Sequence, residues 1–119
     1  MLNRAPILIV EDEPYIALEL QTSVEDAGGE VVGPVGTVSA ALVLLETSVV
    51  AGAILDVQLS DRDVTPVAEA LIALRVPFVF HSGVGVPPDL QLRCRDAVVF
   101  KKPAAVERLL RTLAEIIAR

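Results

Sequence analysis

Five polar side chains stand at the ends of apolar runs in this chain, and their types could together carry out phosphoryl chemistry. They are Glu11, Asp12, Asp56, Ser82 and Lys102. Carboxylates are hard oxygen ligands of the kind that Mg²⁺ takes, and Mg²⁺ keeps open positions that phosphate oxygens can fill. A hydroxyl and an ammonium can hold two phosphoryl oxygens, and a carboxylate can itself be the nucleophile.

Each of these residues also has an ordinary explanation. Asp12 could be only a helix cap, Ser82 a turn residue, and Lys102 a solvated surface charge. An isolated Asp56 would usually be an acid that ends a strand. The chemical interpretation therefore depends on whether the fold brings the five side chains to one place. Crowded carboxylates would then need a cation, because like charges raise one another's pKa.

The apolar pattern predicts the elements that would position them. The expected strands are residues 6–10, 31–32, 50–55, 76–80 and 97–100. The expected helices are residues 14–27, 38–45, 64–74, 89–95 and 106–117. Such alternation of strand and helix is typical of a parallel sheet with helices on both faces. The carboxyl ends of the strands then share one edge, where ligands bind in open α/β sheets.

The helix starts leave two choices open. Asp12 or Glu13 could cap the first helix, and Thr37 or Ser39 could begin the second. The Gly33-Pro34 pair predicts a turn after a short second strand.

Composition narrows the class of protein. The 119 residues fit one domain, and an aromatic content of only 3% requires an aliphatic core. The net charge is −6, and no basic cluster exceeds Lys101-Lys102, which argues against direct nucleic-acid binding. No apolar run approaches the roughly 18 residues of a membrane span. Cys94 is the single cysteine, which fits a reducing compartment. These features predict a cytoplasmic domain that does not contact a membrane.

Four motifs in order carry a family resemblance that covers essentially the whole chain. They occupy residues 7–14 (ILIVEDEP), 55–59 (LDVQL), 80–83 (FHSG) and 102–103 (KP). The set resembles the CheY-like receiver domain of response regulators in two-component signalling. The resemblance implies a flavodoxin-like (βα)5 sandwich, with a five-stranded parallel sheet in the order 2-1-3-4-5.

The resemblance also implies roles for the acidic residues. Asp56 would accept a phosphoryl group from the phosphohistidine of a histidine kinase. Mg²⁺ would be held by Glu11, Asp12 and Asp56, with the backbone carbonyl of Gln58 as a further ligand.

Two further residues would contact the phosphoryl group. Ser82 takes the place of a family Thr or Ser that moves to bond it. Lys102 takes the place of the family lysine, which directly precedes Pro103, so Lys101 is the weaker candidate. In the family the bond before this proline is usually cis.

Three departures from the family pattern bear on how a signal would leave the site. The place of the family's switch aromatic holds Val99, and Phe100 is one position out of register, which predicts a core role for it. The polar residue that usually lies two beyond the Ser/Thr is Val84, so control of phosphoryl lifetime is expected to fall mainly on Gln58. Thirdly, the Gly- and Pro-rich segment after Ser82 predicts a short fourth helix.

Residues 80–85 resemble a subgroup of stand-alone receivers that also lacks the switch aromatic, although Gly85 stands where that subgroup has an aromatic residue. Strand alternation predicts that His81 points away from the site if Ser82 faces it.

The leading functional hypothesis is a single receiver domain over residues 1–119, without an output domain, that signals by phosphorylation-controlled protein binding. Its partners would be a histidine kinase or phosphotransfer protein and a downstream protein, and a phosphorylation-dependent homodimer is one form of output. The alternative is a phosphorelay carrier or a phosphate sink for a kinase. A metal-dependent phosphatase lacks a candidate general base, and an intact acidic set argues against signalling without phosphate. We therefore expect no enzyme activity beyond self-phosphorylation and autodephosphorylation.

Overall fold

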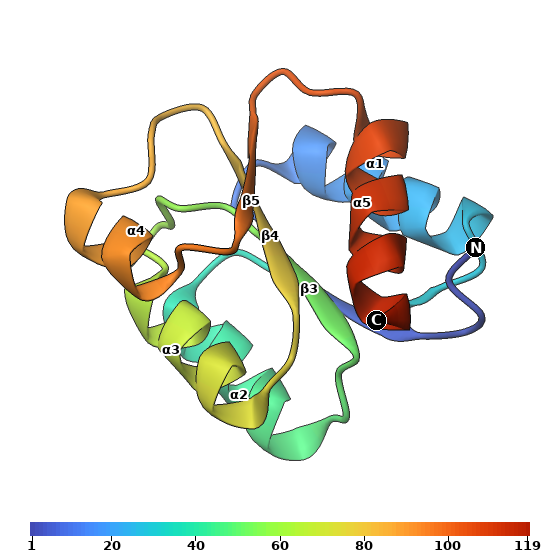
Figure 1. The fold of residues 1–119 in the computed structure, drawn as a ribbon, viewed down its shortest axis with the longest axis horizontal. Coiled ribbons are helices and arrows are strands. Elements are labelled where there is room, and N and C mark those ends of the chain that lie inside the picture. The colour runs from blue at the N-terminus through green and yellow to red at the C-terminus, as the bar shows by residue number, and fades with distance from the viewer.

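The computed structural model describes residues 1–119 as five strands and five helices that alternate along the chain (Figure 1). The strands are β1 (Pro6–Val10), β2 (Glu30–Val35), β3 (Gly52–Leu55), β4 (Phe78–Ser82) and β5 (Val98–Lys101). The helices are α1 (Pro14–Asp26), α2 (Val38–Thr47), α3 (Thr65–Leu74), α4 (Pro88–Arg93) and α5 (Val106–Ala118). All pairings are parallel, in the order β2-β1-β3-β4-β5. The expected flavodoxin-like fold is confirmed.

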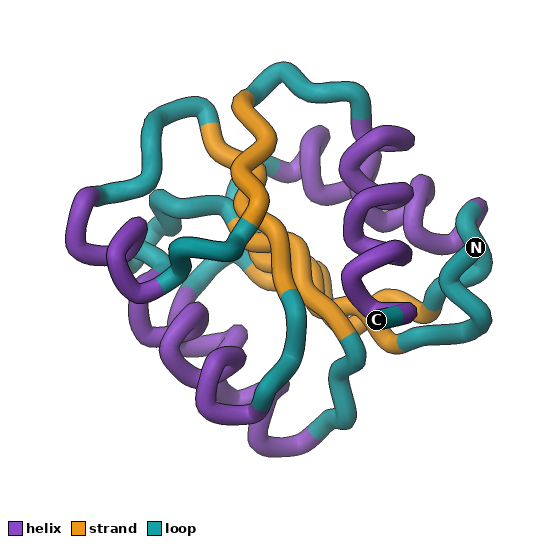
Figure 2. The backbone as a smooth tube through the Cα atoms, in the orientation of Figure 1, coloured by secondary structure: helices purple, strands orange, loops and turns teal.

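Helices cover both faces of the sheet, with α1 and α5 on one side and α2, α3 and α4 on the other (Figure 2). Alternate residues of β1 supply the two layers of the core. Leu8 and Val10 pack with the α2–α4 side, and Ile7 and Ile9 pack with the α1–α5 side. The core is aliphatic apart from a few aromatic rings, so it depends on close packing of branched side chains.

Strand β2 is longer than the sequence predicts. Gly33-Pro34 does not end it, because pairing with β1 resumes at Val10 and Val35 after a register shift beyond Leu8. Gly33 has φ +95°, a conformation that glycine adopts without a steric penalty. The expected turn at Gly33-Pro34 is therefore wrong, and the segment is an irregularity within the strand.

Strand β4 also differs, since it spans Phe78–Ser82 rather than residues 76–80. The shift matters because it places His81 and Ser82 within the strand, opposite Phe100 and Lys101 of β5. Helix α4 is short, as expected, with six residues.

Side-chain caps settle the two open helix starts. The Glu13 carboxylate accepts a hydrogen bond from the Ile16 amide at 3.1 Å, so Glu13 caps α1. The Thr37 hydroxyl accepts from the Ala40 amide at 3.1 Å, so Thr37 caps α2. Asp12 is thereby free for another role. None of the helices combines the length and the apolar composition that crossing a bilayer requires.

Candidate functional site

Three carboxylates gather where β1 and β3 end. The two strands pair in parallel up to Val10 and Leu55, so the residues that follow emerge side by side. Glu11, Asp12 and Asp56 can each offer an oxygen within 4.8 Å of the others. Glu11 and Asp56 are buried, and Asp12 is exposed. Asp12 is therefore the carboxylate of the three that solvent reaches most freely.

Lys102 reaches this cluster from the end of β5. Its Nζ lies 2.7 Å from Glu11 Oε1 in an ion pair and donates a hydrogen bond to Asp56 Oδ2 at 3.2 Å. Burial lowers the pKa of Lys102, but the Glu11 and Asp56 carboxylates offset it, and the pKa ends above its ordinary value. The ammonium therefore stays charged between two acids. The Lys102–Pro103 bond is cis, as the resemblance implies.

Glu11 is the acid most affected by its surroundings. Burial raises the pKa of Glu11 to about 7, and Asp56 acts in the same direction, against Lys102 and the Glu13 amide. Glu11 Oε2 accepts from the Glu13 amide at 3.1 Å, while Oε1 faces the Lys102 ammonium at 2.7 Å. The buried Glu11 carboxylate therefore has the Lys102 ammonium beside Oε1 and a backbone amide on Oε2.

Gln58 lies in the loop after β3, two residues beyond Asp56. No backbone amide or side chain donates to its carbonyl oxygen, although the carbonyls of Val57 and Arg62 on either side of the same loop both accept hydrogen bonds. A backbone carbonyl and three carboxylates are hard donors of the type that Mg²⁺ prefers. The residues present thus fit a magnesium ion.

Ser82 is buried at the end of β4, and its carbonyl accepts from the Lys102 amide at 2.8 Å. The Ser82 hydroxyl accepts from the Val84 amide at 3.2 Å and makes no hydrogen bond to Asp56 or Lys102. The fold therefore brings Ser82 to the same edge as the acids, with its hydroxyl engaged in its own turn. Val84 is half exposed and offers no polar group.

Two residues near the site were not singled out from the sequence. Ser60 Oγ donates to Asp12 Oδ2 in a long contact of 3.4 Å. Asp61 accepts from the amides of Val38 and Ser39 at 2.9 and 3.2 Å. The second contact joins residues 23 and 22 positions apart, a separation that no local pattern reveals.

His81 is buried, and in β4 it falls on the face of Val79, opposite that of Ser82. Neither ring nitrogen has a hydrogen-bond partner. Burial lowers the pKa of His81, and the charge of Lys102 adds to this, so the imidazole is neutral at pH 7. His81 belongs to the helix-covered interior and not to the acidic edge.

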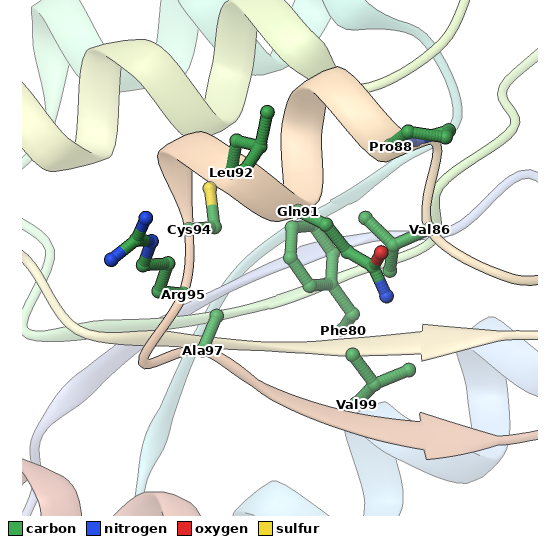
Figure 3. Close-up of a pocket in the computed structure, with 9 residues that line it drawn as sticks. All are labelled: Phe80, Val86, Pro88, Gln91, Leu92, Cys94, Arg95, Ala97 and Val99. Carbon is green, nitrogen blue, oxygen red and sulfur yellow. The ribbon is translucent and has the colours of Figure 1, made fainter.

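A cavity of about 500 Å³ lies between α4 and β5, on the Ser82 side of the sheet (Figure 3). Phe80 and Val99 are paired neighbours in β4 and β5, and both project into it. Phe100 falls on the other face and packs with the α1–α5 side of the core, as expected. The place of the family's switch aromatic thus holds a small side chain beside an open space.

Known proteins resemble this chain in sequence and fold, although no family model matches it. SdrG from Sphingomonas melonis Fr1 is similar over the whole of both chains, with 38% identity and a TM-score of 0.81. The BeF3-activated conformation of SdrG from Pseudomonas melonis Fr1 shares 41% identity over 98% of this chain and 99% of its own, with a TM-score of 0.73. A CheY-like response regulator receiver domain protein from Methanospirillum hungatei JF-1 has the same fold, with 24% identity over 96% of this chain and 94% of its own and a TM-score of 0.85.

Among curated proteins, the phyllosphere-induced regulator PhyR of Methylorubrum extorquens is 39% identical over 77 residues. That match covers 62% of this chain and only 29% of PhyR, so the chain spans less than a third of that relative. The identity to SdrG over full length, the strand order and the acidic edge agree with one another. This chain belongs to the response-regulator receiver domains of two-component signalling.

Proposed function

We propose that this protein is a response regulator whose Asp56 accepts a phosphoryl group from a histidine kinase or phosphotransfer protein. The observation that carries the proposal is the contact of one ammonium, on Lys102, with two buried acids of a three-carboxylate cluster. The lone, buried Cys94 thiol suits a reducing compartment such as the cytoplasm.

Glu11, Asp12, Asp56 and the Gln58 carbonyl would hold Mg²⁺. When bound, the metal would neutralise charge on the oxygens of the phosphoryl group in transfer. Lys102 is already placed to take a further share of that charge, because its Nζ lies beside Asp56 Oδ2. The pKa of Lys102 lies above its ordinary value, so the group is a cation at any pH at which the protein works.

In the transfer itself, a carboxylate oxygen of Asp56 forms the new O–P bond as the N–P bond of the donor phosphohistidine breaks. The electron pair of the broken bond stays on the imidazole nitrogen. The product is an aspartyl phosphate, which carries a charge of about −1.5 to −2 where the carboxylate carried −1, so the site becomes more negative.

That added charge would draw the Ser82 hydroxyl away from the Val84 amide and toward a phosphoryl oxygen. The exchange would release the turn at residues 82–84 and bias the segment that leads to α4. Output would then be a changed affinity for a downstream protein, or for a second copy of this chain.

A phosphorelay carrier or phosphate sink is the second candidate, and the open space beside Val99 favours it. With no aromatic residue to fill that space, the usual link between Ser82 and the surface of β5 is missing. A carrier needs fast transfer and no change in partner affinity.

Beryllofluoride tests the switch, because it occupies a phosphoryl place when bound to a carboxylate. In ¹⁵N NMR spectra with Mg²⁺, we expect its addition to shift the amides of Ser82, Val84 and α4. Asp56→Asn should show no response, and Asp63→Asn, in the same loop, should respond as wild type. Shifts confined to the acidic edge would favour the carrier. No shift in wild type would contradict the proposed function.

A further inference from the structure

The loop that follows the phosphoacceptor is fastened to the start of α2. Asp61 Oδ1 accepts from the Val38 amide at 2.9 Å, and Asp61 Oδ2 accepts from the Ser39 amide at 3.2 Å. These are the first two amides of α2, which have no partner within the helix. Thr37 caps the third amide, that of Ala40. Asp61 thus completes the cap of a helix that lies in another part of the chain.

A second set of contacts joins the same two segments to the acidic edge. The Ser60 amide lies 3.5 Å from the Gly36 carbonyl, and Ser60 Oγ lies 3.4 Å from Asp12 Oδ2. Gly36 also packs directly on Asp12, since a Cβ at Gly36 would be 3.2 Å from Asp12 Cα. The β2–α2 connection, the β3–α3 loop and Asp12 therefore form one contiguous cluster.

Backbone hydrogen bonds hold the loop after β3 in one shape, so that a change in the position of Asp61 also changes the position of Gln58. It folds back on itself through bonds from the Val64 amide to the Val57 carbonyl at 2.8 Å and from the Leu59 amide to the Arg62 carbonyl at 3.2 Å. Val57, Leu59 and Val64 are buried. Gln58 and its free carbonyl lie between two of these anchored residues, so displacement of Asp61 would move that oxygen.

We infer that Asp61 is a positioning residue for the magnesium site, because its hydrogen bonds to the first turn of α2 fix the loop that carries it. It touches neither metal nor phosphoryl group. It fixes the loop that presents the Gln58 carbonyl, and through Ser60 it orients Asp12. The inference rests on the proposed function, because the ion it serves is the one proposed there.

The coupling works in both directions. If the hydrogen bonds between Asp61 and α2 raise the affinity for Mg²⁺, then bound Mg²⁺ must raise the equilibrium constant for forming those hydrogen bonds by the same factor. Mg²⁺ should therefore slow hydrogen exchange at the Val38 and Ser39 amides, which a purely electrostatic effect of the Asp61 charge would leave unchanged.

Asp63 provides a matched control. It lies in the same loop, is also ionised, and accepts from the Thr65 amide, the first of α3, at 2.9 Å. It makes no hydrogen bond to the β2–α2 connection. Asp61→Ala and Asp63→Ala each remove one negative charge from the loop. The first loses the hydrogen bonds to α2, and the second loses the hydrogen bond to α3.

The experiment is isothermal titration of the full chain with MgCl2, for wild type, Asp61→Ala, Asp61→Asn and Asp63→Ala. Loss of a residue that orients metal ligands typically weakens metal binding about 10- to 100-fold. We expect Kd to rise at least about tenfold in Asp61→Ala and less than about threefold in Asp63→Ala. Asp61→Asn keeps one acceptor oxygen and should fall between them.

Equal Kd changes in Asp61→Ala and Asp63→Ala would overturn the inference while leaving the proposed function intact. So would unchanged exchange at Val38 and Ser39 on addition of Mg²⁺ to wild type. If Asp61→Ala fails to fold, Asp61→Asn and the exchange measurement decide. A wild type that binds no Mg²⁺ would overturn both the inference and the proposed function.

Discussion

Glu11 carries the clearest consequence at the scale of single residues. Its pKa of about 7 means that a proton competes with a cation for the same carboxylate near neutral pH. We expect Mg²⁺ to bind about tenfold more tightly at pH 8 than at pH 6, because the ionised fraction of Glu11 changes by about that factor. Glu11→Gln should bind weakly at both pH values. Equal affinity of wild type at pH 6 and pH 8 would show that Glu11 is not a ligand.

The same group makes stability depend on pH in a defined direction. A carboxyl whose pKa is raised from 4.5 to about 7 on folding binds its proton more tightly in the folded state. Its favourable contribution is complete below about pH 4.5 and is lost as pH rises through 7. In Mg²⁺-free buffer we expect the Tm of wild type, relative to that of Glu11→Gln, to fall between pH 5 and pH 8. A relative Tm that rises over this window would contradict the assignment.

Lys102 has a neighbour that serves as its control. Lys102 contacts two buried acids, whereas Lys101 is exposed and makes no ion pair. Lys102→Met should lower the free energy of unfolding by about 1–3 kcal/mol in Mg²⁺-free buffer. This is less than the loss of stability when one partner of a fully buried ion pair is removed, because Glu11 can take up a proton. Mg²⁺ should restore part of the loss. Lys101→Met should be near neutral in urea titrations, and equal effects would argue against the ion pair.

At the scale of elements, sequence reasoning succeeds where signals are local. Continuous apolar runs indicate β1 and β3, and parallel pairing then brings Glu11, Asp12 and Asp56 together without further information. It fails where distant segments decide the outcome. Strand β2 continues past Pro34 because Val35 pairs with Val10 of β1. Asp61 accepts a hydrogen bond from the start of α2, although it lies in the loop after β3.

The direction of the Ser82 hydroxyl belongs to the same class of failure. Its type and place at the end of β4 follow from the sequence, but its partner does not. The hydroxyl accepts from the Val84 amide, and under the proposed function it would turn to the acidic edge when Asp56 is phosphorylated. The structure shows the hydroxyl bonded to the Val84 amide, and its bond to a phosphoryl group is a prediction.

Helix α4 and its cavity lead to a prediction about Cys94. The thiol is buried beside the cavity, and burial raises its pKa, so little thiolate is present at pH 7. We expect the folded protein to react with Ellman's reagent at least about 100-fold more slowly than the protein in urea. Rapid reaction of the native thiol would show that α4 opens far more often than its packing implies.

At the scale of the whole molecule, charge is divided unevenly between two parts of the chain. Residues 1–74 hold twelve acidic and two basic side chains, and residues 75–119 hold four acidic and eight basic ones. The acidic part includes the candidate metal site. We expect 0.5 M NaCl to raise the Tm of the Mg²⁺-free protein by a few degrees, because salt screens the repulsion among these acids.

Millimolar MgCl2 should give a similar or larger rise at far lower ionic strength, because it would bind rather than screen. In Asp56→Asn the gain from MgCl2 should shrink, and the gain from NaCl should remain. Identical responses to the two salts at equal ionic strength would indicate that no specific cation site exists.

The proposed function requires that Asp56 accept a phosphoryl group at this acidic edge. The most direct measurement is intact-mass spectrometry after incubation with acetyl phosphate and MgCl2, for wild type, Asp56→Asn and Asp63→Asn. We expect one phosphoryl adduct on wild type and on Asp63→Asn, none on Asp56→Asn, and none on wild type when EDTA replaces MgCl2. An adduct that persists in Asp56→Asn, or wild type that remains unmodified even by a phosphorylated histidine kinase, would contradict it.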